Sequence, residues 1–366
     1  MTVWPISTPF EASQGQQIIE EQLPLSPIQR TTIKNILKSG LSHTTEINFA
    51  IEGYSLTSYD QIRYAWQAIA SQNAALRTEI ERCDDLDVVE TTCQRVLRKP
   101  LSIQFCCSHS AKGSKYHQAA QMIVRISEGQ LHISVAIHRA LIDHASSSLL
   151  QGAFHSFISG FAFRRCFEYT DYIQQTNLKD HIAAETYWKT YLSGLVETPV
   201  HCYPLETSST NSVTSIQLSK NVSDQLDRLA KAWHVPVRSL LYTAWTQVLL
   251  WHTEASMDSV SFAVMGRDLT MPRIETTVGL IDQVYPLRAS VGPNVSVRQA
   301  AESLRDSDEE SSAKAYVGYD AILKLSPGYR PSTLVLIESQ KDCGEVPKAE
   351  VGVPHCAPGS FVVSQH

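Results

Sequence analysis

The sequence predicts an α/β protein made of two related lobes. Strand-like and helix-like segments alternate through its 366 residues, and they follow a similar order in the first and the second half. A polar interval, LETSSTNSVT at 205–214, separates the halves and is the expected linker. The predicted domains are residues 1–204 and 205–366, two layered lobes with a cleft between them.

In the first half, a helix is expected to begin at Pro27, because Ser26 is a capping residue type and proline suits the first helical position. Alternating polarity or short apolar runs predict strands at 45–53, 76–82, 86–97, 101–108, 122–127 and 130–138. The last two flank Glu128-Gly129 and are expected to form a hairpin. Helical spacing predicts helices at 58–73 and 143–160.

The second half shows the same alternation. Its expected strands are 215–219, 258–266, 283–291 and 332–339, and its expected helices are 223–234, 237–252 and 296–305. The last thirty or so residues are rich in Gly, Pro, Lys and Glu and predict a loose polar tail. The second lobe is therefore expected to be truncated, with a sheet edge left uncovered or covered by a partner chain.

The composition argues against several classes of function. The formal net charge is -6, with 31 Lys+Arg against 37 Asp+Glu and no basic block, so neither nucleic acid nor a membrane is an expected partner. The start lacks the regions of a signal peptide and no apolar stretch is long enough to span a bilayer, which predicts a cytoplasmic protein. Eight cysteines without metal-binding spacing predict no metal site. Walker, dinucleotide-binding and GxSxG motifs are absent from the sequence.

The stretch AIHRALIDHASS at 136–147 concentrates reactive side chains where a predicted strand meets a predicted helix. His138 and His144 bracket Asp143 and Arg139, and a strand end beside a cleft is a favoured place for a general base. A histidine near a strand end is more often a hydrogen-bonded packing residue, and that alternative stays open. A metal site of His138, Asp143 and His144 is not expected, because nothing in the spacing holds all three on one face.

The pattern HRALIDHAS resembles the HHxxxDG core motif of the condensation domains of nonribosomal peptide synthetases. Five further segments resemble other motifs of this family: SPIQR at 26–30, LRT at 76–78, YTDY at 169–172, YWKTYLSG at 187–194 and the stretch from GRD to YPLR at 266–288. The six segments follow the family's order over residues 25–290. The chain therefore resembles a stand-alone, fungal-type member with a degenerate core motif.

The resemblance implies two chloramphenicol-acetyltransferase-like lobes in a V-shaped arrangement. It further implies that carrier proteins present donor and acceptor on phosphopantetheine arms, which enter from opposite faces and meet at the motif. Phosphopantetheine would then be a substrate tether, and no bound cofactor is expected. In the family an amine or hydroxyl attacks a thioester, the second histidine of the motif orients or deprotonates this nucleophile, and the aspartate is mainly structural.

This sequence departs from the motif at the base position. Aligned by Asp143, the first histidine is His138, the second is replaced by Arg139, and the glycine is replaced by His144. Arginine keeps its proton and has no acceptor atom, so Arg139 cannot act as a base. The pleat of a strand turns His138 to the other face, and the single-histidine pattern HxxxD fails because Ile142 stands at its aspartate position. His144 remains as an imidazole that could turn inward.

The last motif is altered as well. Residues 282–284 are Asp-Gln-Val where the family has Val-Asn-Thr, which changes the wall that would face the substrate. Arg288 persists, and we expect it to form a salt bridge with Asp143; a solvated charge at a strand end is the alternative.

Three functions follow from these patterns. The first is a condensation-type transferase of secondary metabolism that forms an amide or ester bond from carrier-protein thioesters, with Arg139 stabilising developing negative charge. The second is an inactive condensation-like module that binds carrier proteins or scaffolds a synthetase. The third is a product-release cyclase that needs the shape of the cleft more than a base.

Overall fold

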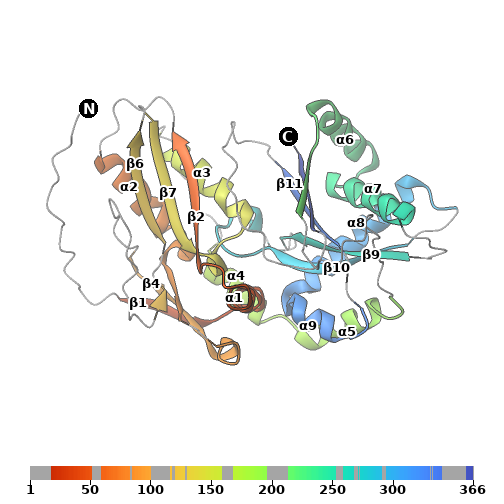
Figure 1. The fold of residues 1–366 in the computed structure, drawn as a ribbon, viewed down its shortest axis with the longest axis horizontal. Helices are drawn as coiled ribbons and strands as arrows, with labels where there is room; N and C mark the ends of the chain where they lie inside the picture. Colours follow the sequence, from red (N-terminus) through yellow and green to blue (C-terminus); the bar gives the residue numbers. More distant parts are fainter. Residues whose placement is uncertain are drawn as a thin grey trace.

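The computed structural model describes residues 18–51, 59–82, 85–99, 116–117, 120–127, 130–158, 168–195, 213–252, 259–267, 271, 273–290, 294–329, 331, 333–339 and 360–365. These residues form two α/β lobes that lie side by side (Figure 1). The predicted two-lobed α/β fold is therefore confirmed. The strand expected at 101–108 lies outside the described residues.

The first lobe contains two sheets. One has the order β1 (Ile19–Pro24), β4 (Cys93–Leu97), β3 (Thr78–Glu81) and β5 (Tyr116–His117), and the other has the order β2 (Thr44–Ile51), β7 (Gln130–His138) and β6 (Gln121–Ser127). All neighbours in both sheets are antiparallel, and β6 and β7 form the predicted hairpin. The helices of this lobe are α1 (Pro27–Ser39), α2 (Tyr59–Ser71), α3 (His144–Ile158) and α4 (Tyr169–Asn177), with short 3-10 turns η1 (Ala74–Arg77), η2 (Val89–Thr91) and η3 (Arg139–Leu141).

Helix α1 begins where the sequence predicts. The Ser26 hydroxyl accepts the backbone N–H of Gln29, and the Gln29 side chain accepts the backbone N–H of Ser26, which makes a capping box before Pro27. The helix ends at Ser39, and the next residue, Gly40, has a φ of 66°, the left-handed conformation that glycine adopts without strain. The residues at its two ends thus determine where this helix begins and stops.

The second lobe has one five-stranded sheet. Its order is β10 (Gln283–Ser290), β9 (Ser259–Gly266), β11 (Leu334–Ser339), β12 (Ser360–Gln365) and β8 (Val213–Gln217). Its helices are α5 (His181–Tyr191), α6 (Lys220–Trp233), α7 (Val237–His252), α8 (Val297–Lys314) and α9 (Tyr319–Lys324), and its 3-10 turns are η4 (Ile274–Thr276) and η5 (Ala315–Val317). Strand β12 pairs in parallel with both β11 and β8. The loose polar tail was therefore a wrong expectation for residues 360–365, which fill an interior place in the sheet.

Packing assigns α5 to the second lobe, although it precedes the expected boundary at residue 204. Trp188 of α5 is fully buried with Phe262 of β9 in the second core, and its indole N–H donates to the carbonyl of Lys314 at 2.9 Å. The greater part of the expected linker, 205–212, lies outside the described residues. The boundary itself stays a prediction.

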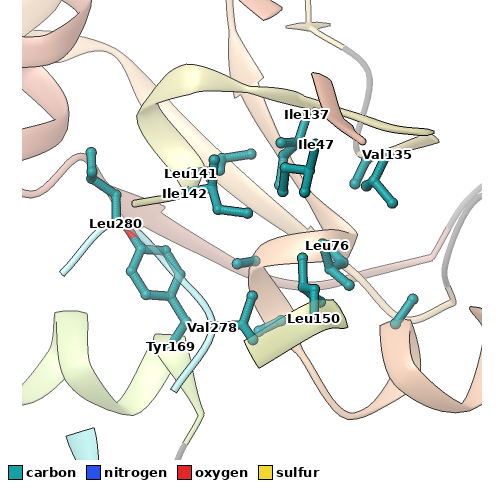
Figure 2. Packing of buried hydrophobic residues seen from close by; sticks show 14 of the residues in the cluster. Ile47, Leu76, Val135, Ile137, Leu141, Ile142, Leu150, Tyr169, Val278 and Leu280 are labelled. Atoms are coloured by element: carbon teal, nitrogen blue, oxygen red, sulfur yellow. The ribbon is translucent and has the colours of Figure 1, made fainter. Parts of the chain in front are cut away.

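A segment from the second half of the chain crosses into the first lobe. Val278, Leu280 and Ile281, between η4 and β10, are buried in the core cluster that holds Ile137 of β7 and Leu150 of α3 (Figure 2). Burying such aliphatic side chains contributes about 1.5–3 kcal/mol each. The two lobes are thus joined by a shared apolar core as well as by the polar contacts of the site.

Candidate functional site

Residues 138–144 form a strand–turn–helix junction between the lobes. Strand β7 ends at His138, η3 takes the chain through Arg139–Leu141, and α3 begins at His144. The Asp143 carboxylate accepts the backbone N–H of Ser146 at 3.0 Å, so it caps α3 and lies at the positive end of the helix dipole. The predicted boundary between strand and helix is confirmed.

His138 is a buried residue that caps the turn. Its side chain is 2% exposed, and its Nδ1 accepts the backbone N–H of Ala140 at 3.1 Å. The ring lies 5.6 Å from the ring of His43, measured between centroids, with an interplanar angle of 46°. His138 therefore has the packing and hydrogen-bonding role that the sequence left open as an alternative.

Arg139 lies against the segment that leads into β2. Its backbone N–H donates to the carbonyl of His43 at 2.8 Å, and its Nε donates to the carbonyl of Ser42 at 2.9 Å. The side chain is partly exposed. Arg139 thus presents a guanidinium that is tied to a neighbouring loop and cannot accept a proton.

Asp143 is held by groups from both lobes. Arg267, directly after β9, donates from Nη2 to Oδ1 at 2.6 Å and from Nε to Oδ2 at 3.2 Å. The backbone N–H groups of Ile281 and Asp282 donate to Oδ2 at 3.1 and 3.2 Å. Both oxygens of the Asp143 carboxylate are thus engaged by charged and backbone donors, which hold the side chain in place.

The expected salt bridge between Asp143 and Arg288 is wrong. In the β9–β10 pair Gly266 lies opposite Gln283, which places Arg267 beside Asp282 and hence beside Asp143. Arg288 lies six residues beyond Asp282 along the strand, a distance of about 20 Å at the rise of a β-strand. There its backbone N–H donates to the hydroxyl of Tyr191 at 2.7 Å.

His144 is the first residue of α3 and is partly exposed. It follows Asp143 at the helix start, whereas Arg139 belongs to the turn at the end of β7. Within the described part of the chain, no group of three or more His, Cys, Asp or Glu residues has a geometry that could hold a metal ion.

Ser146 and Gly279 also belong to the site; Gly279 lies in the segment 266–288 that resembles the last family motif, whereas Ser146 was not predicted. The Ser146 hydroxyl lies 2.7 Å from Asp143 Oδ1, accepts the backbone N–H of Gly279 at 2.9 Å, and lies 3.0 Å from the Gly279 carbonyl. A Cβ at Gly279 would come within 2.2 Å of Cδ2 of Tyr169, so only glycine fits against this ring. In the sequence, the small size of these two residues was the feature that could have indicated their place in the site.

The segment SPIQR at 26–30 contacts the turn η3 from the start of α1. Gln29 of α1 is fully buried and donates from Nε2 to the carbonyl of Ala140 in η3 at 3.0 Å. The same amide pairs with Gln94 of β4, whose Nε2 donates back to Gln29 Oε1 at 3.0 Å. The serine and glutamine of SPIQR therefore link the start of α1 to the core motif.

A small pocket lies at the junction of α1, α4, β10 and η5, separate from residues 138–144. Polar side chains on its wall include Ser26, Tyr172, Thr176 and Gln283, and Gln283 Nε2 donates to the Tyr172 hydroxyl at 3.0 Å. Burial raises the pKa of the nearby Tyr169 phenol well above its usual value, with Tyr172 and Asp143 adding to the rise. This phenol stays protonated.

The fold and the site together define a class of protein. Its members are two-lobed α/β domains in which an arginine of one lobe binds the aspartate of a strand–turn–helix motif in the other. The family model described as "Condensation domain" matches residues 19–339, so the chain belongs to the condensation domain family. The fold agrees with that of the condensation domain from the monacolin K polyketide synthase MokA, with a TM-score of 0.67 at 13% identity, over 90% of this chain and 86% of that one. The chloramphenicol-acetyltransferase-like fold expected from the sequence is confirmed.

Two further similarities concern sequence and architecture. The chain is 22% identical over 291 residues to the malformin synthetase mlfA of Aspergillus niger, which covers 76% of this chain and 6% of that synthetase. The chain thus spans a small fraction of the length of this relative. The X-domain from teicoplanin biosynthesis, solved in complex with OxyB, matches with a TM-score of 0.62 at 14% identity, over 94% of this chain and 84% of that chain. No described helix is both long and apolar enough to cross a membrane.

Proposed function

We propose that this domain catalyses condensation-type acyl or peptidyl transfer in nonribosomal peptide synthesis. An amine or hydroxyl on one carrier protein would attack the thioester on another, forming an amide or ester bond and releasing a thiol. Phosphopantetheine would be the tether of both substrates. Carrier proteins or synthetase subunits in the cytoplasm would be the partners.

The observation that supports this proposal is that hydrogen bonds from both lobes hold the turn of the motif. Gln29 holds the carbonyl of Ala140 from the first lobe, and Arg267 holds Asp143 from the second. A turn fixed at both ends can orient two tethered reactants, and orientation alone supplies up to about 7–11 kcal/mol of a barrier in well-aligned reactions. The partly exposed guanidinium of Arg139 adds a cation that can stabilise the oxyanion of the tetrahedral intermediate.

A second candidate is a non-catalytic module that binds carrier proteins or scaffolds a synthetase. The observation in its favour is the bond from Arg139 Nε to the carbonyl of Ser42, which occupies the base position with a group that cannot take a proton. The X-domain from teicoplanin biosynthesis, solved in complex with OxyB, is an example of this fold in a complex of two proteins.

Mass spectrometry of loaded carrier proteins separates the two candidates. The domain is incubated with a donor carrier bearing an acyl thioester and an acceptor carrier bearing an aminoacyl thioester, and the mass added to the acceptor is followed over time. The transferase proposal expects transfer above the enzyme-free rate, and a slower rate for Arg139→Ala. No transfer by the unchanged domain with any donor, together with a gain in Arg139→His, would instead support the non-catalytic candidate.

A further inference from the structure

We propose that Gln94 is a positioning residue for the transfer reaction, because it fixes the amide of Gln29, which in turn holds the motif turn that carries Arg139. This inference rests on the transferase function proposed above. Gln94 lies in β4, outside the six segments that resemble motifs of the family.

The side-chain amides of Gln94 and Gln29 form a closed pair. Gln29 Nε2 donates to Gln94 Oε1 at 2.9 Å, and Gln94 Nε2 donates back to Gln29 Oε1 at 3.0 Å. The two residues are 1% and 0% exposed, so these bonds lie in the protein interior. Turning either amide alone by half a turn would bring N–H to N–H and oxygen to oxygen, so each amide fixes the orientation of the other.

Backbone groups determine which way this pair points. Gln94 Nε2 also donates to the carbonyl of Pro24 at 3.1 Å. The backbone N–H of Ser26 donates to Gln29 Oε1 at 2.8 Å, and Gln29 Nε2 donates to the carbonyl of Ala140 at 3.0 Å. A backbone carbonyl only accepts and a backbone N–H only donates, so the polarity of both amides is set, and both N–H groups and both lone pairs of the Gln29 amide are used.

The last of these bonds ends on the motif turn. The turn η3 has three residues, and its middle residue, Ala140, is fully buried. The Ala140 N–H donates to His138 Nδ1 at 3.1 Å, and its carbonyl accepts from Gln29. Arg139 is bonded directly to this residue, so whatever holds Ala140 also sets the place of the guanidinium that stabilises the oxyanion in the proposed reaction. Gln94 acts on Arg139 through Gln29.

Gln94→Glu tests this role because it reverses the polarity at one position with little change of shape. In either orientation a carboxylate oxygen would face the acceptors that Gln94 Nε2 now binds, which are the Pro24 carbonyl and Gln29 Oε1. The Gln29 amide can answer only by turning, and its oxygen would then face the Ala140 carbonyl. We expect transfer between loaded carrier proteins to fall about 100-fold, the loss that a misplacement of about 1 Å can cause.

Two comparisons separate positioning from a loss of folding, both made below the unfolding midpoints of the variants. Between about pH 8 and about pH 6 the introduced carboxyl takes up a proton, because burial raises its pKa, and its O–H can then donate. The rate of Gln94→Glu relative to the unchanged domain should therefore rise as the pH falls. Gln94→Met removes the amide without reversing its polarity, so Ser26 and Ala140 still orient Gln29 and the loss of transfer should be clearly smaller.

Hydrogen exchange of residues 139–141 tests the turn without any transfer reaction. The N–H groups of Arg139 and Ala140 should exchange faster in Gln94→Glu than in the unchanged domain. Gln22→Glu adds the same charge at an exposed site of the adjoining strand β1, so it is the matched control and should alter neither exchange nor transfer.

The outcomes distinguish this inference from the function on which it rests. Unchanged exchange of the turn in Gln94→Glu, or equal losses of transfer in Gln94→Glu and Gln94→Met at every pH, would overturn the positioning role while the transferase function stands. No transfer by the unchanged domain would overturn the transferase function and, with it, the role of Gln94 in the reaction.

Discussion

Asp143 and Arg267 form a buried ion pair that joins the two lobes at the core motif. Arg267 Nη2 lies 2.6 Å from Asp143 Oδ1, and the two side chains are 6% and 2% exposed. The same guanidinium donates from Nη1 to the carbonyls of Ile274 and Thr277 at 2.8 Å. This arginine therefore holds the aspartate of one lobe and the backbone of the crossing segment at once.

Asp143→Asn should destabilise the protein by about 3–5 kcal/mol, because it removes the main charge partner of the buried Arg267 and leaves only the weaker contact with Asp282 at 3.9 Å. The free energy of unfolding in urea measures the loss. Arg298→Ala is the control, since the Arg298–Glu302 pair is largely exposed on α8 and its removal should cost no more than about 1 kcal/mol. Equal effects of the two substitutions would contradict the role assigned to the buried pair.

Sequence reasoning succeeded where structure is determined locally. Ser26 and Pro27 set the start of α1, and β6 pairs in antiparallel fashion with β7 as predicted. The core motif was also placed correctly at a strand–helix junction. Each of these depends on neighbours a few residues apart, so their signals are present in short stretches of sequence.

It failed where the outcome depends on how distant strands pair. Arg267 rather than Arg288 reaches Asp143 because Gly266 lies opposite Gln283, and no local pattern reveals that register. His43 reaches His138 through the pairing of β2 with β7. The short apolar run Phe361–Val363 favours a strand, but it does not reveal that residues 360–365 would pair with both β11 and β8.

Gly279→Ala should destabilise the protein by about 1–3 kcal/mol, the usual cost of overpacking a core. The new Cβ would lie 2.2 Å from Cδ2 and 2.7 Å from Cε2 of Tyr169, which is fully buried and has little room to move. Urea denaturation gives the loss. Tyr169→Leu removes the obstructing ring atoms, so in its background Gly279→Ala should cost clearly less; additive losses would show that the ring contact is not the cause.

Gly152→Ala should stabilise the protein by about 0.5–1 kcal/mol, because alanine is the better helix former. Gly152 lies inside α3, it is exposed, and a Cβ there would meet no atom within 4 Å. The substitution is also a control for Gly279→Ala, since both add one methyl group. A loss of stability in thermal or urea unfolding would contradict this account of α3.

The stability of the second lobe should fall above about pH 10, the ordinary pKa of tyrosine. Burial raises the pKa values of the Tyr242 and Tyr285 phenols, and the carboxylate of Asp308 adds to both increases. As pH rises past the unfolded pKa, the unfolded chain releases these protons while the folded chain keeps them. The free energy of unfolding is then unaffected by them below that pH and decreases above it, by up to about 1.4 kcal/mol per pH unit for each tyrosine.

Tyr242→Phe tests this pH dependence directly. The ring lies 5.9 Å from that of Phe262, measured between centroids, and phenylalanine keeps that packing while it removes the ionisable group. Urea unfolding of the unchanged chain and of the variant at pH 9, 10 and 11 should show a shallower decrease for the variant. Because lysines and other tyrosines titrate equally in both proteins, the difference between the two slopes isolates Tyr242, and identical slopes would mean that its phenol ionises without unfolding the lobe.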